Sequence, residues 1–335
     1  MILVTGATGF VGSHLLLHLL ENKERVCAMY RNSASISKTK ALFQLYNKEF
    51  LFEKITWVQA DITDVPSLEL AFKNVDYVYH CAALVSFDPK DEEALRKVNI
   101  EGTANMVNFC LAYNIKKLCH VSSIAALGDL LPHESITDEA TEWNPEKQHS
   151  DYAISKYGAE MEVWRGQQEG LDVVMVNPGV ILGPGFWKEG SGKILNQLSK
   201  GTLFYTEGST GFIAVQDVAN IMVQLMEGNF KGERYVLVAE NRNYRDVLDT
   251  FSNYFHTKKP SIYAEKWMTN MLFRTDWLLS NLFFLKRRFP KTIAKSLHAK
   301  EVYANNKIKK ELQFEFCSID DCILETVNFY KATQQ

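Results

Sequence analysis

Tyr152 and Lys156 are four residues apart, a spacing with a definite chemical use. On a helix the two side chains project from one face, one turn apart. A free phenol has a pKa of roughly 10, and a nearby ammonium favours the phenolate and lowers that value. We therefore predict that Tyr152 acts as a general acid/base with its pKa lowered by Lys156. Because this spacing also arises by chance on amphipathic helices, the rest of the chain must supply a cofactor and a substrate site.

A glycine-rich turn near the start of the chain predicts that cofactor. It separates an apolar run at Met1–Thr5 from apolar residues that recur at helical spacing as far as Leu20. The N-terminus of a helix offers free N–H groups and a positive dipole end, and glycines let the backbone approach a pyrophosphate closely. The spacing is Gly-x-x-Gly-x-x-Gly, and a turn without a ligand is the alternative. The predicted contacts are Gly6, Thr8, Gly9, Phe10, Val11 and Gly12.

The residues after the second predicted strand, Arg25–Tyr30, bear on the type of dinucleotide. An acidic residue there suits the ribose 2′-hydroxyl of NAD, whereas an arginine suits the 2′-phosphate of NADP. Here Arg31, Asn32 and Lys38 follow, and no carboxylate occurs between Glu24 and Glu49. A guanidinium and a lysine favour a phosphate pocket over a solvated basic loop. We expect NADP(H) to be preferred, with NAD(H) as the alternative.

Further candidates follow the third and fourth predicted strands, Ile55–Asp61 and Val75–Cys81. Asp61, with Ile62 beside it, is predicted either to accept a hydrogen bond from an adenine amino group or to cap the next helix. Small residues at Cys81, Ala82 and Ala83 permit close approach of a cofactor. His80 is predicted to be a strand residue with a satisfied side chain rather than a catalyst.

Asn99 and Gly102 interrupt a predicted helix over residues 91–114, where both residue types are less favourable than alanine. This indicates tight packing, or a local role for the Asn99 amide such as holding a water. A fifth strand, Lys117–Val121, ends in Ser122 and Ser123. Hydroxyls at the carboxyl end of a parallel strand lie at the crevice where such sheets bind ligands.

Strands and helices alternate through six units, which predicts an α/β fold with a doubly wound parallel sheet. The sixth strand is Asp172–Asn177. We expect a dinucleotide-binding domain over residues 1–180 and a smaller, mostly helical substrate lobe over 181–335. Segments near 210–240 are expected to return to the main sheet, so that the two parts are interleaved.

Composition and charge limit the classes of function that the chain can have. The 335 residues are 46% hydrophobic and 23% charged, with a formal net charge of −3, so no basic field indicates nucleic acid. Six scattered cysteines show no metal-ligand spacing, and no signal peptide precedes the glycine turn, so we expect free thiols, no metal and a cytoplasmic location.

The apolar run 277–285 is too short to span a bilayer. We predict that it is a buried helix; contact with a membrane surface or an apolar substrate is the alternative.

Taken together, these motifs resemble the extended short-chain dehydrogenase/reductase family, which has a Rossmann sheet. The resemblance covers about two thirds of the chain in register. It rests on Thr5–Gly12, Asp61-Ile62, His80–Ala83, Val98–Thr103, Ser122-Ser123, Tyr152 with Lys156, Asn177–Gly179, Leu182–Gly185 and Val215–Ala219.

The resemblance implies roles for several of these residues. Tyr152 would be the acid/base, and Lys156 would also hydrogen-bond the nicotinamide ribose. Ser123 would hydrogen-bond the substrate oxygen, and Asn99 would support a helix kink or a relay water. Other residues would lie beside the cofactor: Val121, Ser122, Pro178, Gly179 and Val180.

Two branches of the family differ in chemistry. Epimerases and dehydratases of nucleotide sugars usually carry an acidic residue after the second strand, whereas Arg31 and the Asn177-Pro178-Gly179 form resemble dihydroflavonol reductases and 3β-hydroxysteroid dehydrogenases. The resemblance thus favours an NADP-dependent oxidoreductase acting on a bulky small molecule. An epimerase or dehydratase is the alternative, and a catalytically silent dinucleotide-binding protein is a third. A homodimer is expected by analogy with the family.

Overall fold

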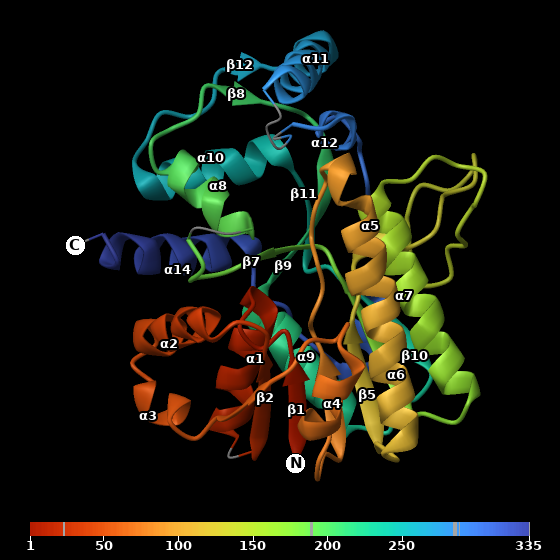
Figure 1. Ribbon diagram of the computed structural model, residues 1–335. Coiled ribbons are helices and arrows are strands. Elements are labelled where there is room, and N and C mark those ends of the chain that lie inside the picture. Colours follow the sequence, from red (N-terminus) through yellow and green to blue (C-terminus); the bar gives the residue numbers. More distant parts are fainter. Residues whose placement is uncertain (23, 188–189, 284–286, 288, 335) are drawn as a thin grey trace.

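Seven parallel strands form one sheet in the computed structural model, which describes residues 1–22, 24–187, 190–283, 287 and 289–334. The chain runs outward from β1 on one side and returns to β4 beside it, so the strand order reverses between β1 and β4 (Figure 1). This confirms the predicted doubly wound topology. The order across the sheet is β10 (Glu233–Leu237), β6 (Val173–Pro178), β5 (Lys117–Val121), β4 (Tyr77–His80), β1 (Ile2–Thr5), β2 (Val26–Tyr30) and β3 (Thr56–Gln59).

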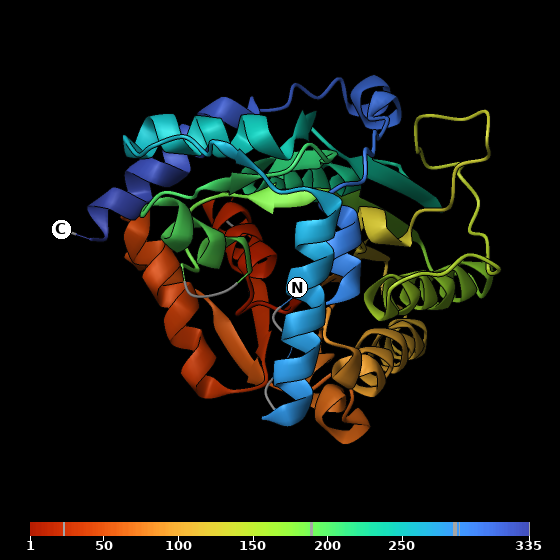
Figure 2. The same ribbon diagram turned by 90° about the horizontal axis from the view of Figure 1, so that it is seen from above.

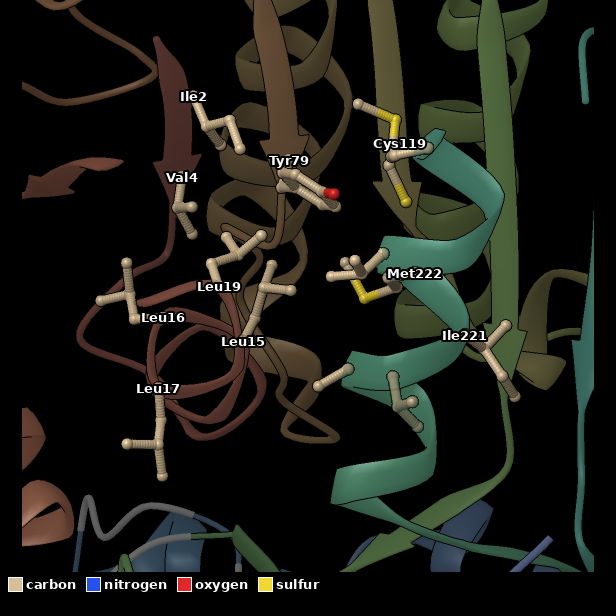
Figure 3. Close-up of a cluster of buried hydrophobic side chains, with 14 of the residues drawn as sticks. Ile2, Val4, Leu15, Leu16, Leu17, Leu19, Tyr79, Cys119, Ile221 and Met222 are labelled. Carbon is tan, nitrogen blue, oxygen red and sulfur yellow. The ribbon is translucent and has the colours of Figure 1, made fainter. Parts of the chain in front are cut away.

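Helices cover both faces of this sheet because its buried strands carry apolar side chains on both sides. Val4 and Tyr79 point toward one layer, where Figure 3 shows them beside Leu15 and Met222, while Leu3 points toward the other. The first layer contains α1 (Phe10–Glu21), α2 (Ile36–Leu45), α3 (Glu49–Phe52), α9 (Val215–Glu227) and α13 (Asn306–Leu312). The second contains α4 (Val65–Ala71), α6 (Gly102–Ala112) and α7 (Asp151–Gln168).

A second group of elements lies beyond the carboxyl ends of the strands (Figure 1). Its sheets are β11-β9-β7 and the pair β12-β8. The strands are β7 (Val180–Leu182), β8 (Phe204–Tyr205), β9 (Ser209–Ala214), β11 (Glu240–Asn243) and β12 (Ile262–Tyr263). The helices are α8 (Gly190–Leu198), α10 (Tyr244–Phe255), α11 (Lys266–Leu282), α12 (Lys291–Ser296) and α14 (Ile319–Ala332).

The chain passes between the two groups more than once. After β9 it returns to the main sheet, where α9 packs beside α1 and β10 pairs with β6. β9 itself pairs with β7 and β11, so only the later part of the segment 210–240 returns to the main sheet. The division of the chain at residue 180 stays a prediction.

The helix predicted over 91–114 contains a π-helical turn. α5 (Glu92–Leu95) leads into the π-turn Arg96–Glu101, which continues as α6. A Cβ atom on Gly102 would lie 2.6 Å from Cδ1 of Ile62, so the glycine lets the side chain that follows β3 pack against the helix. Tight packing at this position is therefore confirmed.

The prediction of a buried helix over 277–285 is wrong for the described residues. Trp277, Leu278 and Leu282 lie at the surface of α11, half or more exposed. Phe284 and Leu285 lie outside the described residues. Within the described chain, no helix is long and apolar enough to cross a membrane.

Candidate active site

The glycine turn packs against the end of β4, at the point where the strand order reverses. Gly6 has φ +62°, and a Cβ atom there would lie 2.6 Å from the amide nitrogen of Ala82. A Cβ atom on Gly12 would lie 2.2 Å from the carbonyl oxygen of Gly6. Gly9 caps α1 without a side-chain hydrogen bond, so the first amides of the helix receive no side-chain acceptor from it. The turn thus forms a backbone cradle that fits a pyrophosphate.

The partly buried backbone of Thr8, Phe10 and Val11 completes this turn and the start of α1. Cys81 and Ala82 follow β4 and are partly buried, and Ala83 is exposed. The sheet therefore brings these predicted cofactor contacts to one crevice at the carboxyl ends of β1 and β4.

Arg31 follows the end of β2, and its side chain is 74% exposed. Its Nη1 is 3.8 Å from a carboxylate oxygen of Asp61, a distance that gives a weak surface ion pair. Asn32 accepts a hydrogen bond of 3.0 Å from the amide of Ala34 and so fixes the following turn. Lys38 is partly buried on α2. Arg31 is therefore held only loosely at the position where a ribose phosphate is expected.

Asp61 stabilises its own turn. One of its carboxylate oxygens accepts hydrogen bonds of 2.9 Å from both the amide and the hydroxyl of Thr63. The N-cap of α4 is Asp64, so Asp61 does not cap the helix directly. The other oxygen faces Arg31, and Ile62 is buried against Gly102.

His80 is a buried structural residue, as predicted. Its ring nitrogens share hydrogen bonds of 2.8 Å with the Thr5 hydroxyl and 3.0 Å with the Thr103 hydroxyl. Burial lowers the pKa of His80 to about 3, so the ring is neutral. It fixes Thr5, whose hydroxyl accepts the amide N–H of Ala82 at 3.2 Å. His80 thereby holds β1 and the end of β4 together.

Ser123, Tyr152 and Lys156 converge at the end of β5. Ser150 caps α7 by accepting the amide of Ala153 at 3.1 Å, which places Tyr152 in the first turn of the helix. Tyr152 forms a side-chain hydrogen bond with Ser123. Nζ of Lys156 donates to the carbonyl of Val121 at 2.9 Å. The predicted catalytic group is thus brought together by two elements, α7 and the turn after β5.

The predicted lowering of the Tyr152 pKa by Lys156 is wrong for this structure. Burial raises the pKa of Tyr152, and the hydrogen bond with Ser123 opposes that rise. Burial also lowers the pKa of Lys156 to about 8, with the Glu160 carboxylate acting in the opposite direction. Desolvation therefore dominates the pKa of Tyr152, and its phenol stays protonated at neutral pH.

Asn99 ties three segments together from the π-turn. Its amide donates to the carbonyl of Leu84 and to the hydroxyl of Ser155, both at 2.9 Å, and its oxygen accepts the Leu84 amide at 2.7 Å. It therefore fixes the segment after β4 against α7. The relay water implied by the resemblance stays a prediction.

A buried network behind the site was not predicted. Glu160, fully buried, accepts a hydrogen bond of 2.5 Å from Asn177 and pairs with Arg234 at 3.1 Å. Asn177 also donates to the carbonyl of Ser123 at 2.9 Å. The sequence carried a signal for Glu160, because residues 152, 156 and 160 continue one helical stripe. It carried none for Arg234, which β10 brings in from a distant part of the chain.

Ser122 and the segment after β6 line the same crevice. The Ser122 hydroxyl is buried and lacks a hydrogen-bond partner among the described residues. A Cβ atom on Gly179 would lie 2.4 Å from the carbonyl oxygen of Gly211, so the chain after Pro178 passes close to β9. Val180 follows and is partly exposed.

Two cavities adjoin these residues. The larger, about 620 Å³, has almost entirely apolar walls, which include Val180, Phe212 and Phe251. The smaller, about 80 Å³, is lined by Tyr152, Phe87 and Arg287 among others. Phe289 lines the larger cavity and Pro290 the smaller, so adjacent residues connect the two linings.

The fold and the site define an enzyme that uses a nicotinamide dinucleotide. The chain belongs to the NAD dependent epimerase/dehydratase family, whose model matches residues 2–238. It is 29% identical over 337 residues to a protein of Synechocystis sp. provisionally named a dihydroflavonol 4-reductase, covering 98% of this chain and 94% of the relative. The predicted resemblance to the dihydroflavonol-reductase branch is thereby confirmed.

Two further proteins show the same likeness. Sterol demethylase protein B of Methylococcus capsulatus is 27% identical over 248 residues, which cover 73% of this chain and 72% of that protein. The crystal structure of gox2253 superposes with a TM-score of 0.81 at 26% identity, covering 99% of this chain and 98% of that one.

Proposed function

We propose that the protein is an NADP-dependent oxidoreductase that reduces a ketone or aldehyde of a bulky, apolar small molecule, or oxidises the corresponding alcohol. The observation that carries the proposal is the pair of hydroxyl groups of Ser123 and Tyr152, with Tyr152 in the wall of the smaller cavity and the large apolar cavity next to it. Two hydroxyl donors suit a carbonyl oxygen on which negative charge develops. Apolar walls suit a substrate that carries this oxygen on a hydrophobic body.

Each side chain of the site has a separate task in this reaction. The bound dinucleotide supplies or accepts the hydride. Ser123 hydrogen-bonds the substrate oxygen, and Tyr152 gives its proton to that oxygen in reduction or takes it back in oxidation. The raised pKa of Tyr152 keeps the phenol protonated, which is the form that donates a proton in reduction. Lys156, fixed by the Val121 carbonyl, contributes a positive charge beneath the pair.

The preference for NADP rests on Arg31. Its exposed guanidinium has only a weak ion pair with Asp61, so it can turn toward a 2′-phosphate at little cost. Asn32 and Lys38 add polar and cationic groups on the same side of β2. In this proposal Asp61 is left to accept a hydrogen bond from the adenine.

The substrate class follows from the cavity and from the relatives. A volume of about 620 Å³ with apolar walls suits a polycyclic or long-chain molecule rather than a nucleotide sugar. The relatives carry the names of a dihydroflavonol reductase and a sterol demethylase protein, both of which denote molecules with fused rings.

The test combines binding and turnover. We expect NADP(H) to raise the melting temperature more than NAD(H), because a ligand that binds only the native state stabilises it. NADPH consumption with polycyclic ketones should fall by about 100-fold or more in Tyr152→Phe. Tyr113→Phe, at an exposed tyrosine on the far end of α6, should leave it unchanged.

Three results would argue against the proposal. Stabilisation by UDP-glucose with no turnover of ketones would favour an epimerase. Dinucleotide binding without any turnover would favour a silent binding protein. Turnover that survives in Tyr152→Phe would remove Tyr152 from the reaction.

A further inference from the structure

α11 has an apolar face that is exposed at the surface of the protein. Its outward stripe consists of Trp267, Met271, Arg274, Leu278 and Leu282, at the i, i+4, i+7, i+11, i+15 spacing of one helix face. The four apolar residues of this stripe are between 57% and 65% exposed. Helices of water-soluble proteins normally turn their apolar face toward the core. This helix lies at the outer surface of the molecule (Figure 2) and carries exposed apolar side chains along its length.

The inward stripe of α11 is short and largely polar. Thr269 shares a hydrogen bond of 2.9 Å with His298, and Asp276 pairs with Arg287 at 3.4 Å. Ser280 is buried and donates to the carbonyl of Trp277. Turning the helix over would separate Thr269 from His298 and Asp276 from Arg287 and leave those partners unpaired. The apolar stripe is therefore held outward by the packing of its opposite face.

The exposed apolar surface extends beyond the helix. Leu203 and Phe204 on one segment and Ile262 on another add exposed side chains beside α11, where β8 pairs with β12 (Figure 1). A concentration of exposed apolar side chains of this kind is typical of an interaction site. We call the outward stripe of α11 with these three residues the docking face.

The stretch of sequence that contains α11 is strongly basic. Residues 256–300 contain ten lysines and arginines but only two acidic residues, Glu265 and Asp276, in a chain whose formal net charge is −3. Asp276 points inward to Arg287, and Arg274 lies within the apolar stripe. Tryptophans with arginine and lysine around an exposed apolar helix fit the interface of a membrane that contains anionic lipid.

The docking face adjoins the large cavity and shares Phe204 with it. Phe204 and Leu272 line the cavity and are also about half exposed at the surface. Met268 and Thr269, on the inner side of α11, form part of the same lining. An apolar molecule that left a bilayer beneath α11 would therefore enter the cavity without crossing water.

We propose that the docking face binds the surface of an anionic lipid bilayer and that α11 lies in its interfacial layer, so that the large cavity opens toward the lipid. The docking step is independent of the enzymatic activity. The loading of an apolar substrate from the bilayer rests on the function proposed above.

Vesicle binding tests the docking step in the absence of cofactor and substrate. The full chain should cosediment with vesicles of three parts phosphatidylcholine to one part phosphatidylglycerol, and less with phosphatidylcholine alone. The double variant Leu278→Glu, Leu282→Glu should reduce the bound fraction by about tenfold or more. Arg274→Gln should reduce it by about fivefold on anionic vesicles, the usual effect of one basic residue near such a surface.

A matched control places the same charges elsewhere. Phe50→Glu with Leu70→Glu alters two residues on α3 and α4 that are exposed to the same degree, and it should bind vesicles like the unaltered protein. Equal binding by the α11 double variant and this control would overturn the proposal. So would the absence of vesicle binding by the unaltered protein at low salt.

A second copy of the chain is the competing occupant. Sedimentation velocity without lipid would then show a dimer that the Leu278→Glu, Leu282→Glu variant converts to a monomer. That result, with no vesicle binding, would also overturn the proposal.

Turnover separates loading from catalysis. With a polycyclic ketone dissolved in vesicles, the α11 double variant should be slower by about tenfold, in line with its loss of binding. With a water-soluble aldehyde it should match the unaltered protein, whereas Tyr152→Phe should lose both reactions. Equal loss on both substrates in the α11 variant would refute loading, and full activity of Tyr152→Phe would refute the proposed function while leaving the vesicle result intact.

Discussion

Glu160 and Arg234 form an ion pair inside the protein, with 3.1 Å between Nη1 and Oε2 and no exposure of the Glu160 side chain. The pair joins α7 to β10. Glu160 also holds Asn177, which donates to the carbonyl of Ser123. The backbone of the candidate catalytic serine is thus fixed by charges contributed from two distant parts of the chain.

Removal of Arg234 should be much more harmful than removal of both charges. Arg234→Met leaves the Glu160 carboxylate buried and unpaired, which typically costs about 3–5 kcal/mol of unfolding free energy. Glu160→Gln in the same chain should restore most of that stability, because the amide oxygen can still accept from Asn177. Urea unfolding of the single and double variants measures the coupling. In the double variant, a lower kcat with an unchanged KM for NADPH would mark a positioning role. If the losses of unfolding free energy caused by the two substitutions simply add, the two residues act independently.

Arg31→Ala should change the cofactor preference. A lost charge-assisted contact to a 2′-phosphate should raise the KM for NADPH by about 10-fold or more and leave that for NADH nearly unchanged. Lys40→Ala removes an exposed cation from α2 and serves as the control. Equal effects of Arg31→Ala on both dinucleotides would rule out a 2′-phosphate contact.

Asp217→Asn should stabilise the protein in a pH-dependent way. Burial raises the pKa of Asp217 from 3.8 to about 6. Between pH 3.8 and about 6 the native state binds more protons than the unfolded state, so Asp217 lowers the free energy of unfolding as the pH rises. Above that range the destabilisation by Asp217 is complete. The asparagine should therefore gain roughly 1–2 kcal/mol at neutral pH and almost nothing near pH 4. Urea midpoints at both pH values measure this, and an equal gain at the two would contradict the assignment.

Gly12→Ala should damage the cofactor cradle far more than Gly9→Ala. The added methyl group would meet the Gly6 carbonyl oxygen at 2.2 Å in the first variant and at 3.2 Å in the second. The first contact requires the turn to open, which should lower the melting temperature. It should also weaken the affinity for NADPH by about 10-fold or more. Calorimetric titration with NADPH measures the affinity. Similar affinities in the two variants would show that the turn can adjust.

Much of the fold followed from local patterns. The predicted strands agree with the observed ones to within two residues at either end, because alternating apolar runs and helical spacing are properties of neighbouring residues. The convergence of Ser123, Tyr152 and Lys156 followed from the rule that ligands bind at the carboxyl ends of parallel strands.

What could not be predicted depends on distant contacts or on burial. Arg234 reaches Glu160 only because β10 adds to the edge of the sheet. No local pattern in the sequence predicts that β10 pairs with β6. The raised pKa of Tyr152 reflects desolvation, which is absent from a spacing rule. The exposure of Trp277, Leu278 and Leu282 could not be predicted, because an apolar run in a sequence does not show whether the protein itself covers it.

The return of the chain to β10 limits how the enzyme can be re-engineered. A chimera that exchanged everything after β6 for the corresponding half of a related enzyme would also replace α9 and Arg234, and with them the support of Ser123. A new substrate specificity would have to be grafted in two pieces, one on each side of residues 215–237. Recombination libraries with a single crossover near residue 180 should accordingly give few folded members.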